Sequence, residues 1–268
     1  MTVRRAYTLL LVTGLVATSA ASAETARALL DHRKQLDDTT RHWDDREQHV
    51  ALTIERKLGA PFERTVAIYE RRLGAGEEQA VAFMLEPASV RGVAFLSYGH
   101  DDRADDQWVY LPALKKVRRI SGNERNESFF ETDLTYQDVD VLQDLVKWPE
   151  ADAPATLLGE EEIDGTPTYK IELKPHVDDV DYSRILVWLA KDDLMARRTE
   201  MFAGDAEPRK IVEQSDIRLV DGIPVAFRLV ASTPAKSSRS VMQVTAVRFN
   251  QHPESELFTQ RALAQGAP

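Results

Sequence analysis

The sequence predicts a mainly β fold with few helices (α+β), in which a curved antiparallel sheet forms an incomplete β-barrel with a helical lid. Apolar and polar residues alternate with a period of two in about ten or eleven segments between Val50 and Phe249, as in half-buried strands. The Asp-Gly pairs at 164–165 and 221–222 lie between such segments and are typical of hairpin turns. An open sheet of that size seldom stays flat, so we expect it to curl and to carry helices against its concave side.

The first 23 residues have the pattern of a cleaved signal peptide. Arg4 and Arg5 precede an apolar run, and the small residues Ala21, Ser22 and Ala23 precede Glu24. This order of charged, apolar and small residues directs export, with cleavage after Ala23. No low-complexity linker divides residues 24–268, so we expect them to form a single domain.

Composition excludes several functions. The chain has no cysteine, which excludes disulfides, thiol catalysis and cysteine-ligated metals. The formal net charge is −10, and removal of the leader, which carries two arginines and no acid, makes the chain more acidic. An acidic protein lacks the basic field that binds nucleic acid or an anionic membrane surface, and we expect no nucleic-acid partner.

No sequence pattern indicates catalysis. The chain lacks a G-x-S-x-G elbow, an H-E-x-x-H motif and a glycine-rich phosphate loop. The acidic turn from His100 to Asp106 lacks the glycine and glutamate of an EF-hand loop, and the acids beside His176 lack zinc-type spacing. We therefore expect no enzyme, no metal site and no cofactor.

Two helices are predicted, one before the strand pattern and one within it. Residues 24–36 predict a short amphipathic helix, and residues 37–47 after it are highly charged apart from Trp43. Asp133 is the predicted N-cap of the second helix, which Pro149 ends. The apolar positions of this second helix are at helical spacing: Leu134, Val141, Leu142 and Leu145. A helix that interrupts a meander must lie across a face or an opening of the sheet, so we expect it to act as a lid.

The most unusual segment runs from Gln107 to Asp138. Trp108, Tyr110 and Leu111 form an aromatic strand, and four cations follow it: Lys115, Lys116, Arg118 and Arg119. The aromatic strand is either ordinary core or the wall of a cavity. The cations Lys116, Arg118 and Arg119 either protect an edge strand, bind an anionic head group, or pair internally with Asp133 and Asp138.

These residues resemble the outer-membrane lipoprotein-sorting proteins, the family of LolA-like periplasmic carriers. The resemblance rests on Trp108–Ile120, on Ser128–Asp138 and on the C-terminal Asn250–Leu263. It extends over Gly92–Leu96 and the two Asp-Gly turns, and so over most of the chain after the leader. It implies an unclosed antiparallel barrel whose apolar cavity, lidded by helices, shelters an acyl chain or lipid.

The resemblance implies a periplasmic carrier for a lipid or an acylated lipoprotein, which helps its transfer across the envelope. The family subgroup that this chain resembles implies a resistance-nodulation-division type inner-membrane exporter as a partner. The alternative is an envelope protein-binding or sensor module with the same fold and no cargo. The candidate cavity or mouth residues are Trp108, Tyr110, Leu111, Leu134, Tyr136 and Leu142.

Overall fold

The structure, a computed structural model, describes residues 25–74, 76–100, 103–177, 180–204 and 206–268. The predicted signal peptide, residues 1–23, lies outside these ranges. None of the helices in the described ranges is both long and apolar enough to cross a membrane.

Thirteen strands form one antiparallel sheet in the order β6-β5-β4-β3-β2-β1-β13-β12-β11-β10-β9-β8-β7. The first six are β1 (Asp45–Glu55), β2 (Phe62–Gly74), β3 (Glu77–Glu86), β4 (Ala94–Gly99), β5 (Asp106–Leu111) and β6 (Lys116–Ile120). The other seven are β7 (Ala155–Ile163), β8 (Thr166–Leu173), β9 (Arg184–Ala190), β10 (Ala196–Phe202), β11 (Lys210–Val220), β12 (Ile223–Thr233) and β13 (Ser238–Phe249).

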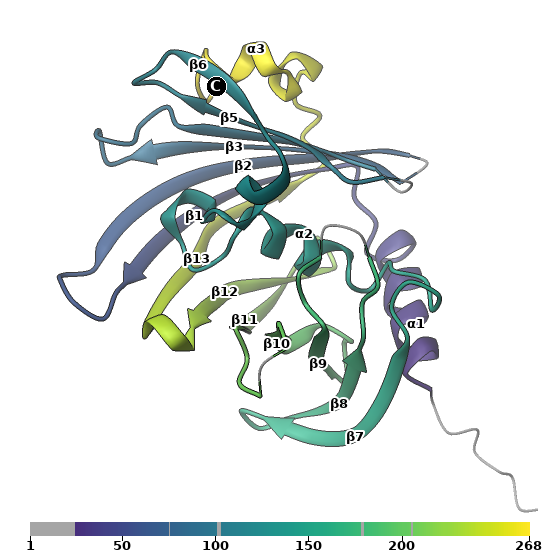
Figure 1. Cartoon of the computed structure of the whole chain (residues 1–268). Coiled ribbons are helices and arrows are strands. Elements are labelled where there is room, and N and C mark those ends of the chain that lie inside the picture. The colour runs from purple at the N-terminus through teal and green to yellow at the C-terminus, as the bar shows by residue number, and fades with distance from the viewer. Residues whose placement is uncertain (1–24, 75, 101–102, 178–179, 205) are drawn as a thin grey trace, which may run out of the picture.

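The sheet consists of two meanders that meet where β1 pairs with β13 in the centre. Within the described ranges β6 and β7 remain its two edges, so the barrel is not closed. Figure 1 shows the first meander curving over the second, with the segment that joins β6 to β7 lying between them. The predicted fold class, a curved and incomplete antiparallel barrel with helices, is confirmed.

Turn chemistry fixes several hairpins. Asp164 and Gly165 both have positive φ values (48° and 80°), as do Asp221 and Gly222 (52° and 82°), which is the conformation that tight two-residue hairpin loops require. The sheet has thirteen strands in the described residues, more than the ten or eleven expected, and β5 and β6 form two of them as a hairpin. The chain reverses between Leu111 and Lys116, with Lys115 at a φ of 51°.

The first helix, α1 (Ala26–Asp38), lies where it was predicted. The Thr25 side chain accepts a hydrogen bond from the Ala28 N–H and caps it, and Ala26, Leu29 and Leu30 are buried. These apolar side chains pack in the same core as residues of β8 to β12. Helix α1 therefore covers part of the second meander beside β7 (Figure 1).

The second helix, α2 (Tyr136–Asp144), is shorter than predicted and begins later. Its N-cap is Thr135 and not Asp133, because Thr135 and Asp138 form a reciprocal capping box. The Asp133 carboxylate is engaged elsewhere: it accepts hydrogen bonds from the hydroxyl groups of Ser238 and Ser240 on β13. The prediction of Asp133 as the cap was therefore wrong.

The linker between β6 and β7 also contains two 3-10 turns, η1 (Gly122–Asn126) and η2 (Phe129–Glu131). Phe129, Phe130 and Tyr136 pack with Phe95 of β4 on the inner face of the first meander. The C-terminal turn and helix, η4 (Ser255–Phe258) and α3 (Gln260–Leu263), cover the opposite face of the same strands. The first meander is thus buried on both faces.

Candidate functional site

A pocket of about 1620 Å³ lies between the concave face of the sheet and the linker that carries α2. This central pocket is larger than the roughly 300–1,000 Å³ typical of small-molecule sites. Its floor is apolar and comes from the central strands of both meanders. The floor residues are Val50, Leu52, Val66, Ile68, Leu229, Met242 and Val244. Because strands alternate faces, these positions follow from the period-two pattern of β1, β2, β12 and β13.

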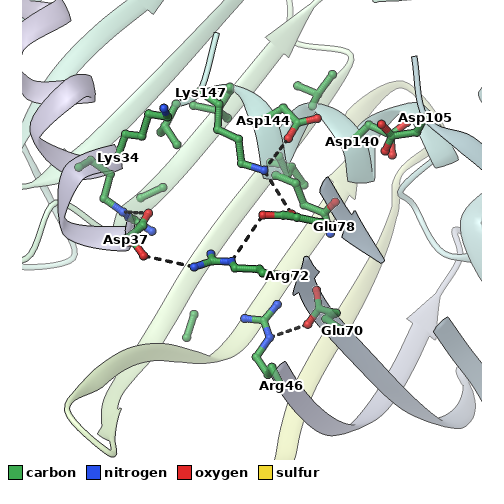
Figure 2. Close-up of a pocket in the computed structure, with 18 of the residues that line it drawn as sticks. Lys34, Asp37, Arg46, Glu70, Arg72, Glu78, Asp105, Asp140, Asp144 and Lys147 are labelled. Carbon is green, nitrogen blue, oxygen red and sulfur yellow. Dashed lines mark hydrogen bonds and ion pairs between the residues drawn. The ribbon is translucent and has the colours of Figure 1, made fainter. Parts of the chain in front are cut away.

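One rim of the central pocket is lined by ion pairs (Figure 2). The Lys147 ammonium, just after α2, lies 3.0 Å from Asp144 Oδ1 and 3.3 Å from Glu78 Oε2. Arg72 on β2 lies 3.5 Å from Glu78 Oε1 and donates to the Asp37 carbonyl at the end of α1. This chain of contacts connects both helices to the β2–β3 hairpin of the first meander.

Burial alone would lower the pKa of Lys147, but Asp144 and Glu78 outweigh it and the pKa is raised. The lysine therefore stays charged at neutral pH. Both side chains of the Lys147–Glu78 pair are about one-third exposed (33% and 34%). An ion pair exposed to that degree stabilises by only about 0–1 kcal/mol, so this end of the lid is weakly held.

Two carboxyl groups at the same rim have raised pKa values. Burial, together with the nearby Asp144, raises the pKa of Asp105 to about 6. Burial, together with Asp105, raises the pKa of Asp140 on α2 to about 7, although Arg125 opposes the shift. Gln107 Nε2 also donates to Asp140 Oδ1 at 2.8 Å. The lid and the β4–β5 turn thus face each other through acidic groups that repel when both are ionised.

The opposite pKa shifts of the neighbouring Asp105 and Asp106 predict opposite effects of pH on stability. Folding raises the pKa of Asp105 from 3.8 to about 6. Its contribution to stability is therefore present below about pH 4 and is lost as the pH rises through 6. Hydrogen bonds from Arg103 and His100 lower the pKa of Asp106 from 3.8 to about 2, so its contribution is present above about pH 4 and lost in acid. At pH 8 we expect Asp105→Asn to raise the melting temperature by roughly 2–4 °C and Asp106→Asn to lower it by a similar amount.

Thermal unfolding of both variants at pH 4 and pH 8 measures these effects. The Asp105→Asn variant should differ little from the parent at pH 4, where Asp105 is already protonated. Shifts of the same sign for both variants at pH 8 would contradict the assignment of a raised pKa to Asp105 and a lowered pKa to Asp106.

The other end of the lid is held by buried polar contacts. Asp138 of α2 is fully buried, accepts a hydrogen bond from the Tyr182 hydroxyl and lies 3.6 Å from the Lys210 ammonium. Lys210 also donates to the Asp133 carbonyl and to the Thr233 hydroxyl. Burial lowers the pKa of Lys210, although Asp138 and Asp133 oppose this. These contacts join the start of α2 to β11 and β12.

The structure separates the predicted cavity residues. Trp108 and Tyr110 lie on the face of β5 that packs against Phe258 and Leu263 of the C-terminal segment, away from the central pocket. Leu111 lies on the inner face and packs against the core of the first meander. Leu134 and Tyr136 are buried within the two inner cores beneath the lid. Leu142 lines the central pocket.

The predicted cations and acids do not meet. Arg118 pairs with Glu124 and Glu127 of η1 and its flank, and Arg119 pairs with Asp106. Lys116 is exposed on the edge strand β6. Asp133 and Asp138 have the serine, tyrosine and lysine partners described above.

Sequence reasoning missed the charged rim. Its members come from α1, β2, β3, the β4–β5 turn and the end of α2, which are distant in sequence. The only local signal was the high charge of residues 37–47, which contribute Asp37, Arg41 and Arg46 to the pocket.

The architecture defines a class of protein: an unclosed antiparallel half-barrel with helices in its opening and a pocket against its concave face. A family model described only as an uncharacterized protein matches residues 76–265, which is more than half of the chain. The chain belongs to that family. No curated protein sequence matches the chain.

Three solved structures share the fold. A DUF1329 family protein from Desulfovibrio piger is 27% identical with a TM-score of 0.81, and the match covers 89% of this chain and 97% of that one. An outer membrane lipoprotein-sorting protein domain from Vibrio parahaemolyticus is 21% identical with a TM-score of 0.79, over 89% of this chain and 98% of that one. A LolA superfamily protein from Nitrosomonas europaea is 20% identical with a TM-score of 0.65, over 90% of this chain and 100% of that one. The predicted resemblance to the LolA-like lipoprotein-sorting proteins is confirmed.

Proposed function

We propose that this protein is a carrier of the cell envelope that shelters the acyl part of a lipid or lipoprotein in the central pocket. The observation that carries the proposal is the continuous apolar floor of a pocket of about 1620 Å³, covered by a short helix. A fold relative named for outer membrane lipoprotein sorting and another named as a LolA superfamily protein support it. The leader-like sequence at residues 1–23 supports a periplasmic location.

The hydrophobic effect supplies the binding energy in this proposal. Each methylene that leaves water contributes about 0.8 kcal/mol, before the cost of immobilising the ligand is subtracted. The apolar floor residues listed above do not distinguish one acyl chain from another. Selectivity and release must therefore come from the rim and the lid.

The lid has one strong and one weak attachment, which favours release by pivoting. Asp138 at the start of α2 is fully buried among polar partners, whereas the Lys147–Glu78 pair beyond its end is one-third exposed. A partner that competes for the rim ion pairs would open the pocket there without breaking the buried contacts. The partnership with a resistance-nodulation-division type exporter stays a prediction.

Native mass spectrometry of the protein purified from its own periplasm tests the proposal. We expect adducts with the masses of envelope lipids or acylated fragments, which organic extraction removes and added lipid restores. Repeated recovery of empty protein that binds no added lipid would contradict it. A protein partner captured by cross-linking with no dependence on lipid would favour the binding or sensor module instead.

A further inference from the structure

Arg41 lines the central pocket and, unlike the other arginines there, forms no ion pair with a described residue. Arg41 follows α1 in the loop before β1, and its backbone N–H donates to the Leu36 carbonyl at 2.8 Å. This contact fixes the loop where the helix ends. The Arg41 side chain lines the pocket, beside the rim that α1 forms with the β9–β10 turn.

The arginines around Arg41 have acidic or carbonyl partners within the protein. Arg33 donates to Asp37 Oδ2 at 2.7 Å and to the Leu194 carbonyl at 2.8 Å. Arg46 pairs with Glu70 at 2.5 Å, and Figure 2 shows this pair and the Arg72 contacts within the rim. Each of these arginines forms an ion pair with a carboxylate, although the Arg72 Nε, 3.5 Å from Glu78 Oε1, is itself buried without a hydrogen bond.

Arg41 has no such partner in the part of the chain that the structure describes. Its Nη1 atom is buried without a hydrogen bond, and no carboxylate among the described residues lies within ion-pair distance of its guanidinium. Burial, and then the charge of Arg33, lower the pKa of Arg41, and the opposing charges of Asp37 and Asp193 do not offset them. A buried donor without an acceptor costs stability, so the fold retains Arg41 at a cost that a ligand can offset.

We infer that Arg41 is the anion-binding residue of the central pocket and takes the phosphate or carboxylate head group of an amphiphile whose chain lies on the apolar floor. A guanidinium fork matches both anions in a bidentate geometry. Arg41 and the floor residues Leu229 and Met242 line the same pocket, so one ligand can reach both. This inference rests on the proposed function and adds the class of cargo to it.

Calorimetric titration of delipidated protein with three probes tests the inference. Dodecyl phosphate carries the chain and the anion, dodecyl maltoside carries the chain alone, and inorganic phosphate carries the anion alone; both amphiphiles are used below their micelle concentrations. We expect the parent to bind dodecyl phosphate most tightly. Arg41→Gln should weaken that binding by at least about tenfold, because it removes a charge-assisted hydrogen bond, and leave dodecyl maltoside binding within about twofold.

Arg248→Gln, an exposed arginine on β13 outside the pocket, is the matched control and should change none of the three affinities. Thermal unfolding supplies a second readout: loss of a cation without a partner should leave the melting temperature of Arg41→Gln equal to the parent's or higher. A clear drop in melting temperature would identify Arg41 as structural and overturn the inference.

The results distinguish a failure of the Arg41 inference from a failure of the proposed carrier function. If both amphiphiles bind and Arg41→Gln keeps the preference for dodecyl phosphate, the inference is wrong and the carrier function stands. If neither amphiphile binds the parent, the proposed function fails and the inference falls with it. If inorganic phosphate binds as tightly as dodecyl phosphate, Arg41 serves a free anion and the head-group assignment is overturned.

Discussion

Replacing Asp138 by alanine is expected to lower the free energy of unfolding by about 3–5 kcal/mol, because it leaves a buried lysine without its counter-charge. Asp138 is fully buried and lies 3.6 Å from the Lys210 ammonium. The substitution also removes half of the capping box at the start of α2 and the acceptor of the Tyr182 hydroxyl. Urea denaturation of the variant and the parent measures the loss.

Asp144→Ala is the matched control, in the same helix. Asp144 pairs with Lys147 at 3.0 Å, but both side chains are about one-third exposed (35% and 33%). We expect a loss of at most about 1 kcal/mol for such a pair. Similar losses for the two variants would contradict the view that the lid is held mainly at its first turn.

A double substitution separates the charge from the packing. Replacing Asp138 by leucine and Lys210 by methionine together removes both buried charges, and exchanges of this kind are often neutral. We expect it to recover most of the stability that Asp138→Ala loses. The lid would then stay attached by apolar contacts, and lipid binding should persist.

Local turn chemistry and strand alternation made much of the fold predictable from the sequence. The Asp164-Gly165 and Asp221-Gly222 turns require positive φ at both residues, and that requirement is visible in the residue types themselves. The face of α1 was equally visible, because Leu29 and Leu30 are at helical spacing from Ala26. Such features depend on residues close in sequence.

Which face of a strand meets the pocket was not predictable in the same way. Alternation places Trp108 and Val109 on opposite faces of β5, but it does not say which face is inner. Phe258 and Leu263, far along the chain, cover the face that carries Trp108, and this leaves the inner face to Val109.

Competition from distant residues also decided the roles of charged side chains. Asp133 had the residue type of an N-cap, but Ser238 and Ser240 of β13 take its carboxylate, and Thr135 caps the helix instead. The cations of β6 are unusual because three of them lie within four positions, Lys116 to Arg119, yet Arg118 and Arg119 have acidic partners. Arg41, a single arginine in a charged loop, gave no comparable signal.

Replacing Met242 by aspartate is expected to weaken the binding of dodecyl phosphate by at least about 100-fold. Met242 lies on the central strand β13, lines the pocket and packs against the cores of both meanders. In the open pocket a carboxylate there is hydrated, so the fold should persist. An acyl chain on the floor would have to remove that water, and desolvation of an unpaired charge costs several kcal/mol. The short side chain of aspartate cannot reach the rim to avoid this cost.

Val241→Asp is the control, because Val241 is next to Met242 and alternation places it on the opposite face of the same strand. It should leave the affinity for dodecyl phosphate within about twofold, and far-ultraviolet circular dichroism should show the same strand content for both variants. Equal weakening by the two substitutions would indicate a general effect on the sheet. Binding by Met242→Asp at the parent's affinity would show that the chain does not lie on the concave floor, since a ligand that avoids the floor has no reason to respond to a charge placed there.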